Sequence, residues 1–156
     1  MDAIERWFLR PDRPRCADET KLLILCDGGG SNGYRVRNWK YQLQRQLADR
    51  YGIDVMICHY PTGASKWNPI EHRLFSFISI NWAGQPLRSL NRLTALIRGT
   101  TTQTGLVVKA SQLKGHHPIK VKVSDAEIAT LNLTRRKIYP KWNYVLCSRC
   151  QHTKKT

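Results

Sequence analysis

The chain has 156 residues, of which 41% are hydrophobic. This length suits one domain with a packed core, and the composition is that of a folded chain rather than a disordered one. No apolar run is long enough to cross a bilayer, and the N-terminus lacks the basic start and apolar stretch of a secretion signal. We therefore expect a cytoplasmic protein.

The charge balance is strongly positive, with 26 Lys and Arg against 11 Asp and Glu and a formal net charge of +15. Such an excess favours a polyanionic partner, because neutralising phosphates releases counterions. We expect a nucleic acid rather than a membrane, since no basic helix shows an apolar face suited to lipid. The five cysteines are an odd number and do not predict a disulfide scaffold.

The first part of the chain predicts a helix, a strand, a helix and a strand. A helix within residues 1–10 leads into a connector over 11–20. The aliphatic run 21–26 predicts a buried strand, 35–50 has the apolar spacing of a helix, and 53–59 predicts a second strand. This order implies a parallel pair of strands joined by a right-handed crossover.

The second part predicts further helices and short strands. Asn68 is a good helix N-cap, so a helix should run from there to about Ile80. A further helix is expected over 86–98, and short strands over 106–110 and 119–123. Ser124 opens a capping box and a short helix. The fold class is therefore α/β, with a small parallel sheet flanked by helices.

Asp27 is the first candidate site residue, since it ends the strand 21–26 and opens a glycine-rich loop. Open α/β sheets place ligand chemistry at this end of their strands. The loop, Gly28-Gly29-Gly30-Ser31-Asn32-Gly33, also matches the glycine spacing of a dinucleotide-binding fingerprint. However, the strand 53–59 does not end in the acid that would hold a ribose. Nucleotide binding and a turn without a ligand both remain alternatives.

Glu71 is the second candidate. It stands three residues after Asn68, which is the spacing of a capping box, so a structural role is one interpretation. The other comes from its pairing with Asp27, because both follow neighbouring strands and can face one crevice. Converging carboxylates suit Mg²⁺, and two such ions can support phosphodiester chemistry.

Several segments resemble bacterial insertion-sequence transposases, in particular the group called the Rhodopirellula-type transposase DDE domain. The stretch around Glu71 also resembles the segment around the last acid of mariner-like transposases. The similarity runs from about Lys21 to Tyr144. It is carried by Asp-Gly-Gly-Gly-Ser-Asn-Gly-Tyr-Arg at 27–35, Trp39-Lys40, Cys-His-Tyr-Pro at 58–61, the run 62–78 that contains Asn-Pro-Ile-Glu-His, and later matches at 100–106 and 122–125.

The resemblance implies a ribonuclease H-like catalytic domain that cuts and joins DNA at insertion-sequence ends with two Mg²⁺ (or Mn²⁺) ions. It makes Asp27 the second acid of the Asp-Asp-Glu triad and Glu71 the third, as catalytic residues and metal ligands. Residues near these acids are then candidates for DNA binding, with helix capping and surface solvation as the alternative: Arg35, Lys66, Trp67, Asn68, His72 and Arg73.

The family's first acid has no counterpart on an earlier strand, since Asp2, Asp12 and Asp18 lie in helix or connector sequence. The opening hairpins of a ribonuclease H-like sheet are also lacking. We therefore expect an incomplete fold and a truncated fragment, inactive alone, that could associate with itself or with a full-length transposase. Residues 1–20 form a residual helix and connector, 21–144 the C-terminal part of the catalytic domain, and 145–156 a basic tail.

Two other functions stay open, a non-catalytic basic DNA-binding remnant and, less favoured, a nucleotide-binding domain. In the tail, Cys147-x-x-Cys150 with His152 could form one half of a zinc site, but the sequence has no second half with suitable spacing. We interpret it as a drifted tail rather than a metal site.

Overall fold

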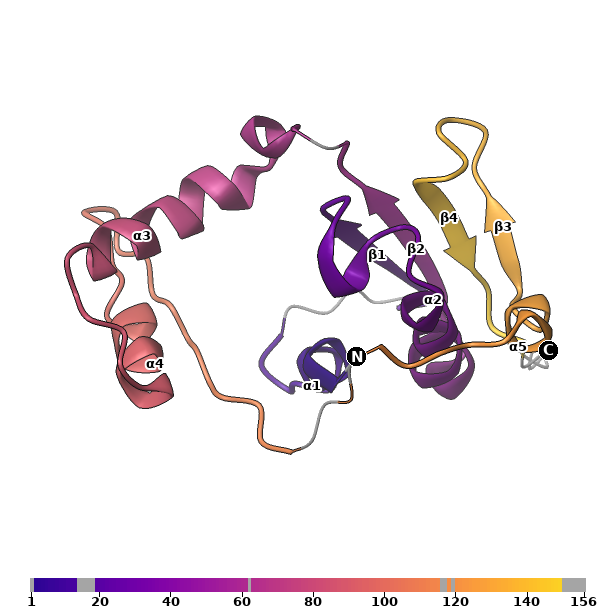
Figure 1. Ribbon diagram of the computed structural model, residues 1–156, viewed down its shortest axis with the longest axis horizontal. Coiled ribbons are helices and arrows are strands. Elements are labelled where there is room, and N and C mark those ends of the chain that lie inside the picture. The colour runs from indigo at the N-terminus through magenta and orange to yellow at the C-terminus, as the bar shows by residue number, and fades with distance from the viewer. Residues whose placement is uncertain (1, 14–18, 62, 116–117, 119, 150–156) are drawn as a thin grey trace. The chain divides into compact units, whose positions relative to one another are not determined.

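The computed structural model describes residues 2–13, 19–61, 63–115, 118 and 120–149. The chain divides into two compact units (Figure 1). Met1–Thr62 and Pro118–Thr156 form one, the sheet unit, and Gly63–His117 form the other, the helical unit. No helix in the described part of the chain is long and apolar enough to cross a membrane.

The sheet unit contains a four-stranded mixed sheet in the order β1-β2-β4-β3 (Figure 1). β1 (Lys21–Cys26) and β2 (Asp54–His59) are parallel, as predicted. β4 (Asn143–Leu146) runs antiparallel to both β2 and β3 (Leu133–Arg135). The α/β class is confirmed, but the prediction of a parallel sheet is wrong, because the hairpin β3–β4 pairs on the far side of β2.

The helices of the sheet unit follow the predicted pattern. α1 (Asp2–Phe8) precedes β1, and α5 (Asp125–Ala129) begins with the predicted capping box. The predicted crossover helix is α2 (Arg37–Leu43), which continues as a π-helical segment, η2 (Gln44–Asp49). Its apolar spacing buries one face against the sheet, and Gly52, at φ +64°, ends it before β2.

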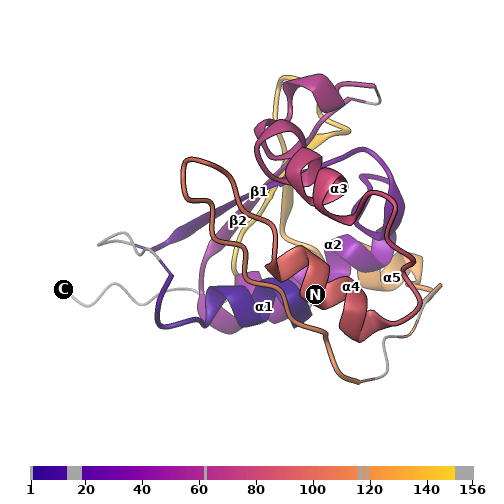
Figure 2. The same ribbon diagram turned by 90° about the vertical axis from the view of Figure 1, so that its left-hand side faces the viewer.

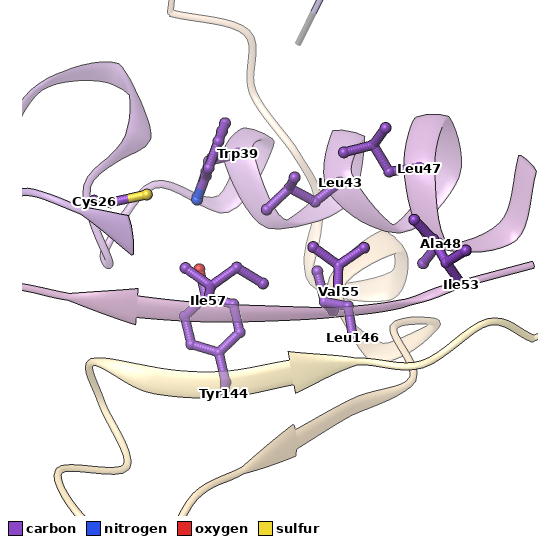
Figure 3. Close-up of a cluster of buried hydrophobic side chains, with 10 residues drawn as sticks. All are labelled: Cys26, Trp39, Leu43, Leu47, Ala48, Ile53, Val55, Ile57, Tyr144 and Leu146. Carbon is purple, nitrogen blue, oxygen red and sulfur yellow. The ribbon is translucent and has the colours of Figure 1, made fainter. Parts of the chain in front are cut away.

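One face of the sheet packs against this crossover helix and forms the core (Figure 3). Leu43 and Leu47 of the helix meet Val55, Ile57, Tyr144 and Leu146 of the strands, and all six are fully buried. Complete burial of such a side chain contributes roughly 1.5–3 kcal/mol. The opposite face is open, and Leu23 and Leu25 of β1 are each 56% exposed. The aliphatic run therefore does not form a strand buried on both faces.

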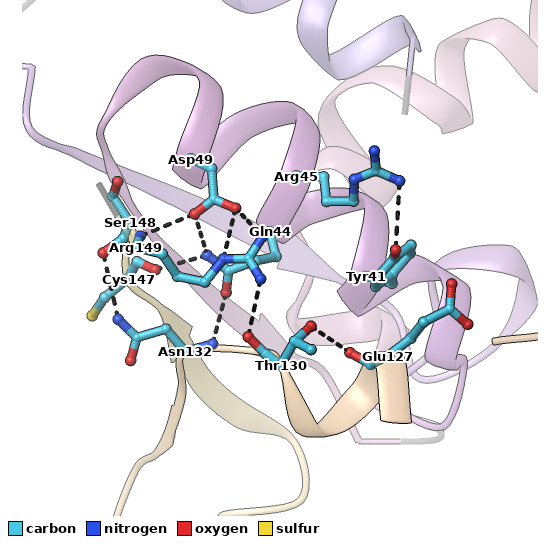
Figure 4. Close-up of polar contacts among 10 residues, drawn as sticks. All are labelled: Tyr41, Gln44, Arg45, Asp49, Glu127, Thr130, Asn132, Cys147, Ser148 and Arg149. Atoms are coloured by element: carbon cyan, nitrogen blue, oxygen red, sulfur yellow. Dashed lines mark hydrogen bonds and ion pairs between the residues drawn. The ribbon is translucent and has the colours of Figure 1, made fainter. Parts of the chain in front are cut away.

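Gln44 attaches the hairpin to this helix (Figure 4). Its buried side-chain amide donates to Asp49 Oδ1 and to the carbonyl oxygen of Cys147, both at 2.8 Å. Its Oε1 accepts from the backbone N–H of Asn132 at 3.0 Å. Asp49 in turn pairs with Arg149, just after β4. Every polar group of the Gln44 side chain thus links the helix to the strand ends.

The helical unit begins with a 3₁₀ turn, η3 (Ser65–Trp67), followed by a continuous helix over 69–82. After residues 69–70, that helix contains a π-helical segment, η4 (Glu71–Phe75), and continues as α3 (Ser76–Trp82). Asn68 caps it through its side-chain oxygen, which accepts from the N–H of Ile70 at 3.2 Å. The helix expected from Asn68 to about Ile80 is confirmed.

α4 (Leu90–Arg98) follows, and Figures 1 and 2 show it alongside α3. It begins later than the predicted start at residue 86, because Ser89 caps it by accepting from the N–H of Arg92. The strands predicted over 106–110 and 119–123 are absent from the described residues there, and Ile119 lies outside them. The described residues of both segments make no strand pairing, and the third and fourth positions of the sheet are taken by the hairpin β3–β4.

Candidate active site at the carboxyl edge of the sheet

Asp27 lies where the sequence predicts, directly after β1 at the carboxyl edge of the parallel pair. The last residues of the two strands, Cys26 and His59, are register partners, and the N–H of Tyr60 donates to the Cys26 carbonyl at 2.7 Å. Asp27 is exposed, and its carboxylate makes no hydrogen bond or ion pair with a described residue. It is therefore available to a partner from outside the fold.

The glycine loop after Asp27 folds onto itself. Gly30–Asn32 form a 3₁₀ turn, and a Cβ at Gly33 would lie 3.1 Å from the carbonyl oxygen of Gly28. The backbone of the loop therefore leaves little room for a side chain at position 33. α2 begins only at Arg37, so no helix N-terminus opens directly at the last glycine. Both features differ from the dinucleotide-binding turn, in which the glycines let a pyrophosphate approach a helix start.

His59 connects the glycine loop with the hairpin, a role that the sequence analysis missed. It is 5% exposed, with Nε2 3.0 Å from the carbonyl oxygen of Asn32 and Nδ1 2.9 Å from that of Trp142. The backbone N–H of His59 also donates to the Trp142 carbonyl at 3.1 Å. Since both partners are backbone atoms from distant parts of the chain, no local sequence pattern indicates these contacts.

Aromatic rings continue this connection across the edge of the sheet. The ring of Tyr34 meets both His59 and Trp142 edge-on, with centroids 6.1 Å apart in each pair. Trp142 stacks on Tyr139 at 5.4 Å. The exposed guanidinium of Arg35, a predicted DNA-binding residue, lies over the Tyr34 ring, and its Nε donates to the Tyr34 hydroxyl at 2.9 Å. Arg35 therefore projects from a surface shared by loop and hairpin.

Cys26, next to Asp27, is a core residue rather than a ligand or nucleophile. Burial and the neighbouring Asp27 carboxylate raise the pKa of its thiol to about 11, although a hydrogen bond with Asn32 acts in the opposite direction. A metal ligand or nucleophile needs the thiolate, which this environment disfavours. With 3% of its surface exposed, Cys26 belongs to the core cluster of the sheet unit.

Glu71 begins the π-helical segment of the helical unit. Its backbone N–H donates to the Asn68 carbonyl at 3.1 Å, but its carboxylate makes no hydrogen bond or ion pair with a described residue. The capping box that offered a structural role for this side chain is therefore not formed, although Asn68 does cap the helix. π-helical turns inside α-helices are frequent at functional sites.

A groove of about 450 Å³ lies in the helical unit beside this helix turn. His72, Arg73 and Phe77 line one side, and Thr102, Thr104 and residues 105–106 the other. The Thr102 and Thr104 hydroxyls lie 2.9 Å apart, and Thr102 Oγ1 accepts from the N–H of Leu106. A guanidinium with two hydroxyls can bind a phosphate oxygen. Both threonines lie in the segment 100–106 that resembles the transposases, but no local sequence pattern indicates that they belong to the site.

The other predicted DNA-binding residues lie on the same unit. Trp67 is 70% exposed, and the ammonium of Lys66 lies 5.2 Å from its ring centroid. His72 Nε2 is 3.0 Å from the carbonyl oxygen of Lys66, which holds the 3₁₀ turn against the helix. Asn68 has the capping role described above. A cation and an exposed aromatic ring side by side suit a nucleic-acid strand.

Comparison with protein families settles what kind of protein this is. Residues 1–148 match the family model described as the Rhodopirellula transposase DDE domain. The chain belongs to this transposase family. No match was found among curated proteins or among solved structures. The resemblance seen in the sequence is confirmed, and membership implies DNA as the partner of this transposase-type chain.

Transposases of the DDE type typically use a divalent metal. The chemistry of Asp27 and Glu71 fits, since both offer hard carboxylate oxygens that no described side chain engages. Asp27 belongs to the sheet unit and Glu71 to the helical unit. Among the described residues, no group of three or more His, Cys, Asp or Glu is placed to hold a metal ion. Cys150 and His152, of the tail's half zinc motif, lie outside the described residues.

Proposed function

We propose that this chain supplies two of the three acids, Asp27 and Glu71, of a cytoplasmic DDE transposase that cuts and joins DNA at insertion-sequence ends. The observation that carries the proposal is the position of Asp27: a free carboxylate at the carboxyl end of β1, within the segment that matches the family. The pairing of Asp27 with Glu71 is supported by the family match, which spans both residues.

We further propose that the sheet unit is part of a ribonuclease H-like fold. The parallel pair β1–β2 with its crossover helix supports this, as does the position of β1 at the edge of the sheet. A further strand can pair along that edge and bring the first acid next to Asp27. Of the described aspartates upstream, Asp2 lies in α1 and Asp12 pairs with Arg10, so neither follows a strand as Asp27 does.

In this proposal, Asp27 and Glu71 hold Mg²⁺ or Mn²⁺ through their carboxylate oxygens. When bound, such ions activate the attacking hydroxyl and stabilise the leaving oxygen of a phosphodiester. Arg73 with Thr102 and Thr104 holds a DNA phosphate in the groove beside Glu71. Arg35, Lys66 and Trp67 position the strand, the cations through phosphates and the indole by stacking on a base.

With two carboxylates, the chain should bind metal weakly and be inactive alone, so activity requires association with a copy of the full-length transposase. Titration with Mn²⁺, followed by the electron paramagnetic resonance signal of the free ion, tests the ligands. Asp27→Asn and Glu71→Gln should each weaken binding, whereas Asp54→Asn, at the amino end of β2, should not. Metal binding that survives Asp27→Asn would show that Asp27 is not a metal ligand. DNA cleavage by this chain alone would contradict the proposal that it is inactive without a full-length transposase.

A non-catalytic DNA-binding role is the second candidate, favoured by the net charge of +15. It predicts salt-sensitive DNA binding that is unchanged in the double variant Asp27→Asn, Glu71→Gln. It also predicts that the chain reduces transposition by a full-length relative when both are present. If Mn²⁺ strengthens DNA binding and the double variant removes that gain, the metal-dependent function is preferred.

A further inference from the structure

The loop that joins β3 to β4 is rich in basic residues, and none of them belongs to the site proposed above. Residues 135–142, which we call the basic hairpin, read Arg135-Arg136-Lys137-Ile138-Tyr139-Pro140-Lys141-Trp142. They hold four cations, and the sequence contains no acid after Glu127. All four cations are exposed, as are Ile138 and Tyr139 at the tip.

The basic hairpin is held in one shape by its own backbone. The N–H of Arg136 donates to the Asn143 carbonyl at 3.0 Å, and that of Trp142 to the Tyr139 carbonyl at 2.9 Å. The side chain of Asn143 donates to the Ile138 carbonyl, also at 2.9 Å. Tyr139 adopts φ +46° and stacks on Trp142. A loop ordered before binding loses little entropy when a partner docks.

The cations of the basic hairpin are not neutralised within the fold. Arg37, Arg50 and Arg149 each pair with a carboxylate. In contrast, the four cations of the basic hairpin make no ion pair with any described residue. Arg135 uses its guanidinium to donate to the Pro140 carbonyl at 2.9 Å. Nearby, burial and then the charges of Arg135 and Arg37 lower the pKa of Lys40. This region therefore carries uncompensated positive charge.

The basic hairpin lies at the same edge of the sheet as Asp27. β4 runs antiparallel to β2, so its first residue, Asn143, pairs with Cys58 near the carboxyl end of β2. His59 holds Trp142 and the glycine loop together through the contacts described above. On the open face, a groove of about 550 Å³ runs beside Arg136 and Lys137, floored by Met56 and Cys58. The cations thus form one surface with the loop that carries Asp27.

We propose that the basic hairpin binds the phosphate backbone of duplex DNA and holds the DNA against the edge that carries Asp27. The choice of DNA rests on the proposed function. Arg136, Lys137 and Lys141 make the phosphate contacts, because their side chains have no described hydrogen-bond partner. Arg135 and the Tyr139–Trp142 pair keep the loop in shape. Binding through phosphates is independent of base sequence and of metal.

The test compares two variants with equal loss of charge. In one, Arg136, Lys137 and Lys141 are changed to Gln. In the other, three exposed cations away from the hairpin, Arg6, Lys21 and Arg45, are changed to Gln. Affinity for a duplex of mixed sequence is measured by fluorescence anisotropy over a series of KCl concentrations, with EDTA present. The hairpin variant should bind at least about tenfold more weakly, and the slope of log affinity against log salt should fall by about 2–3.

The control variant should keep most of the affinity and the slope. Equal losses in both variants, or no loss in the hairpin variant, overturn the proposal. As a second measurement, duplex DNA should protect Lys137 and Lys141 of the unchanged protein from acetylation, read by mass spectrometry, and equal labelling with and without DNA overturns it. Because no metal is present, a negative result here leaves the proposed metal-dependent function standing. Conversely, if Asp27 and Glu71 prove not to bind Mn²⁺, the proposal that the basic hairpin binds DNA still stands.

Discussion

His59 Nε2 lies 3.0 Å from the carbonyl oxygen of Asn32, and this contact fixes the glycine loop beside the end of β2. On its other side, the same ring reaches the carbonyl oxygen of Trp142. A neutral imidazole can donate to only one of these oxygens, and an imidazolium can donate to both. One buried ring thereby sets the positions of the loop that follows Asp27 and of the basic hairpin.

Replacing His59 should release both segments. We expect His59→Ala to lower the free energy of unfolding by about 2–3 kcal/mol, since it removes a buried ring with its contacts to the Asn32 and Trp142 carbonyl oxygens and opens a cavity beside Tyr144. Urea denaturation followed by tryptophan fluorescence measures the change. His72→Ala, an exposed histidine of the helical unit, is the matched control and should have little effect on the same curve. Similar losses in both variants would contradict the role assigned to His59.

Gln44 should be more important for stability than its polarity suggests. Gln44→Leu leaves the Asn132 N–H and the Cys147 carbonyl without their partner, and we expect a loss of roughly 2–3 kcal/mol. Gln42→Leu, two residues earlier, is the control, since Gln42 bonds only to side chains of its own helix among the described residues. Thermal unfolding by circular dichroism compares the two. An unchanged melting temperature for Gln44→Leu would show that the hairpin is attached by other contacts.

The lowered pKa of Asp49 leads us to expect that the fold loses stability in acid. Burial acts to raise the pKa of its carboxyl, but hydrogen bonds from Arg149 and Gln44 outweigh burial and hold the pKa below its usual range. A lowered folded pKa means that the carboxylate stabilises the fold above the unfolded pKa of about 3.9, and that this contribution is lost as pH falls below that value.

Asp49→Asn should therefore be less stable than the parent chain at neutral pH. The difference between the two free energies of unfolding should narrow as the pH falls below about 4. Denaturation at a series of pH values measures both curves. A difference that stays constant from neutral to acid pH would contradict the role of the ionised carboxylate. Asp125→Asn is the control, because Asp125 is highly exposed in its pair with Arg37.

Two glycines of the loop should respond differently to the same substitution. A Cβ at Gly33 would stand 3.1 Å from the Gly28 carbonyl oxygen and 3.3 Å from Gly29, so Gly33→Ala must shift the backbone next to Asp27. At Gly29 nothing lies within 4 Å, and its φ of −116° suits any residue. We expect Gly33→Ala to cost about 1 kcal/mol or more, by the magnitude typical of overpacking, and Gly29→Ala to be neutral. Urea unfolding of both variants decides, and equal effects would contradict the packing argument.

Local chemistry allowed the sequence by itself to predict much of the secondary structure. β1, the crossover helix and β2 follow from an aliphatic run, a helical apolar spacing and a second apolar run. The caps at Asn68 and Ser124 were also predictable, since a cap depends on residues two or three positions apart. The position of Asp27 at the carboxyl edge follows from the same strand-helix-strand order.

Tertiary structure alone decided which apolar segments became strands and what surrounds Asp27. Residues 106–110 are more apolar than Leu133–Arg135, yet only the latter form a strand, because strand formation needs a partner and the neighbouring β4 provides it. His59, Gln44 and the basic hairpin act through partners distant in the chain. Their roles arise from pairing and burial between remote segments, which local sequence does not encode, whereas caps and helical spacing are set by near neighbours.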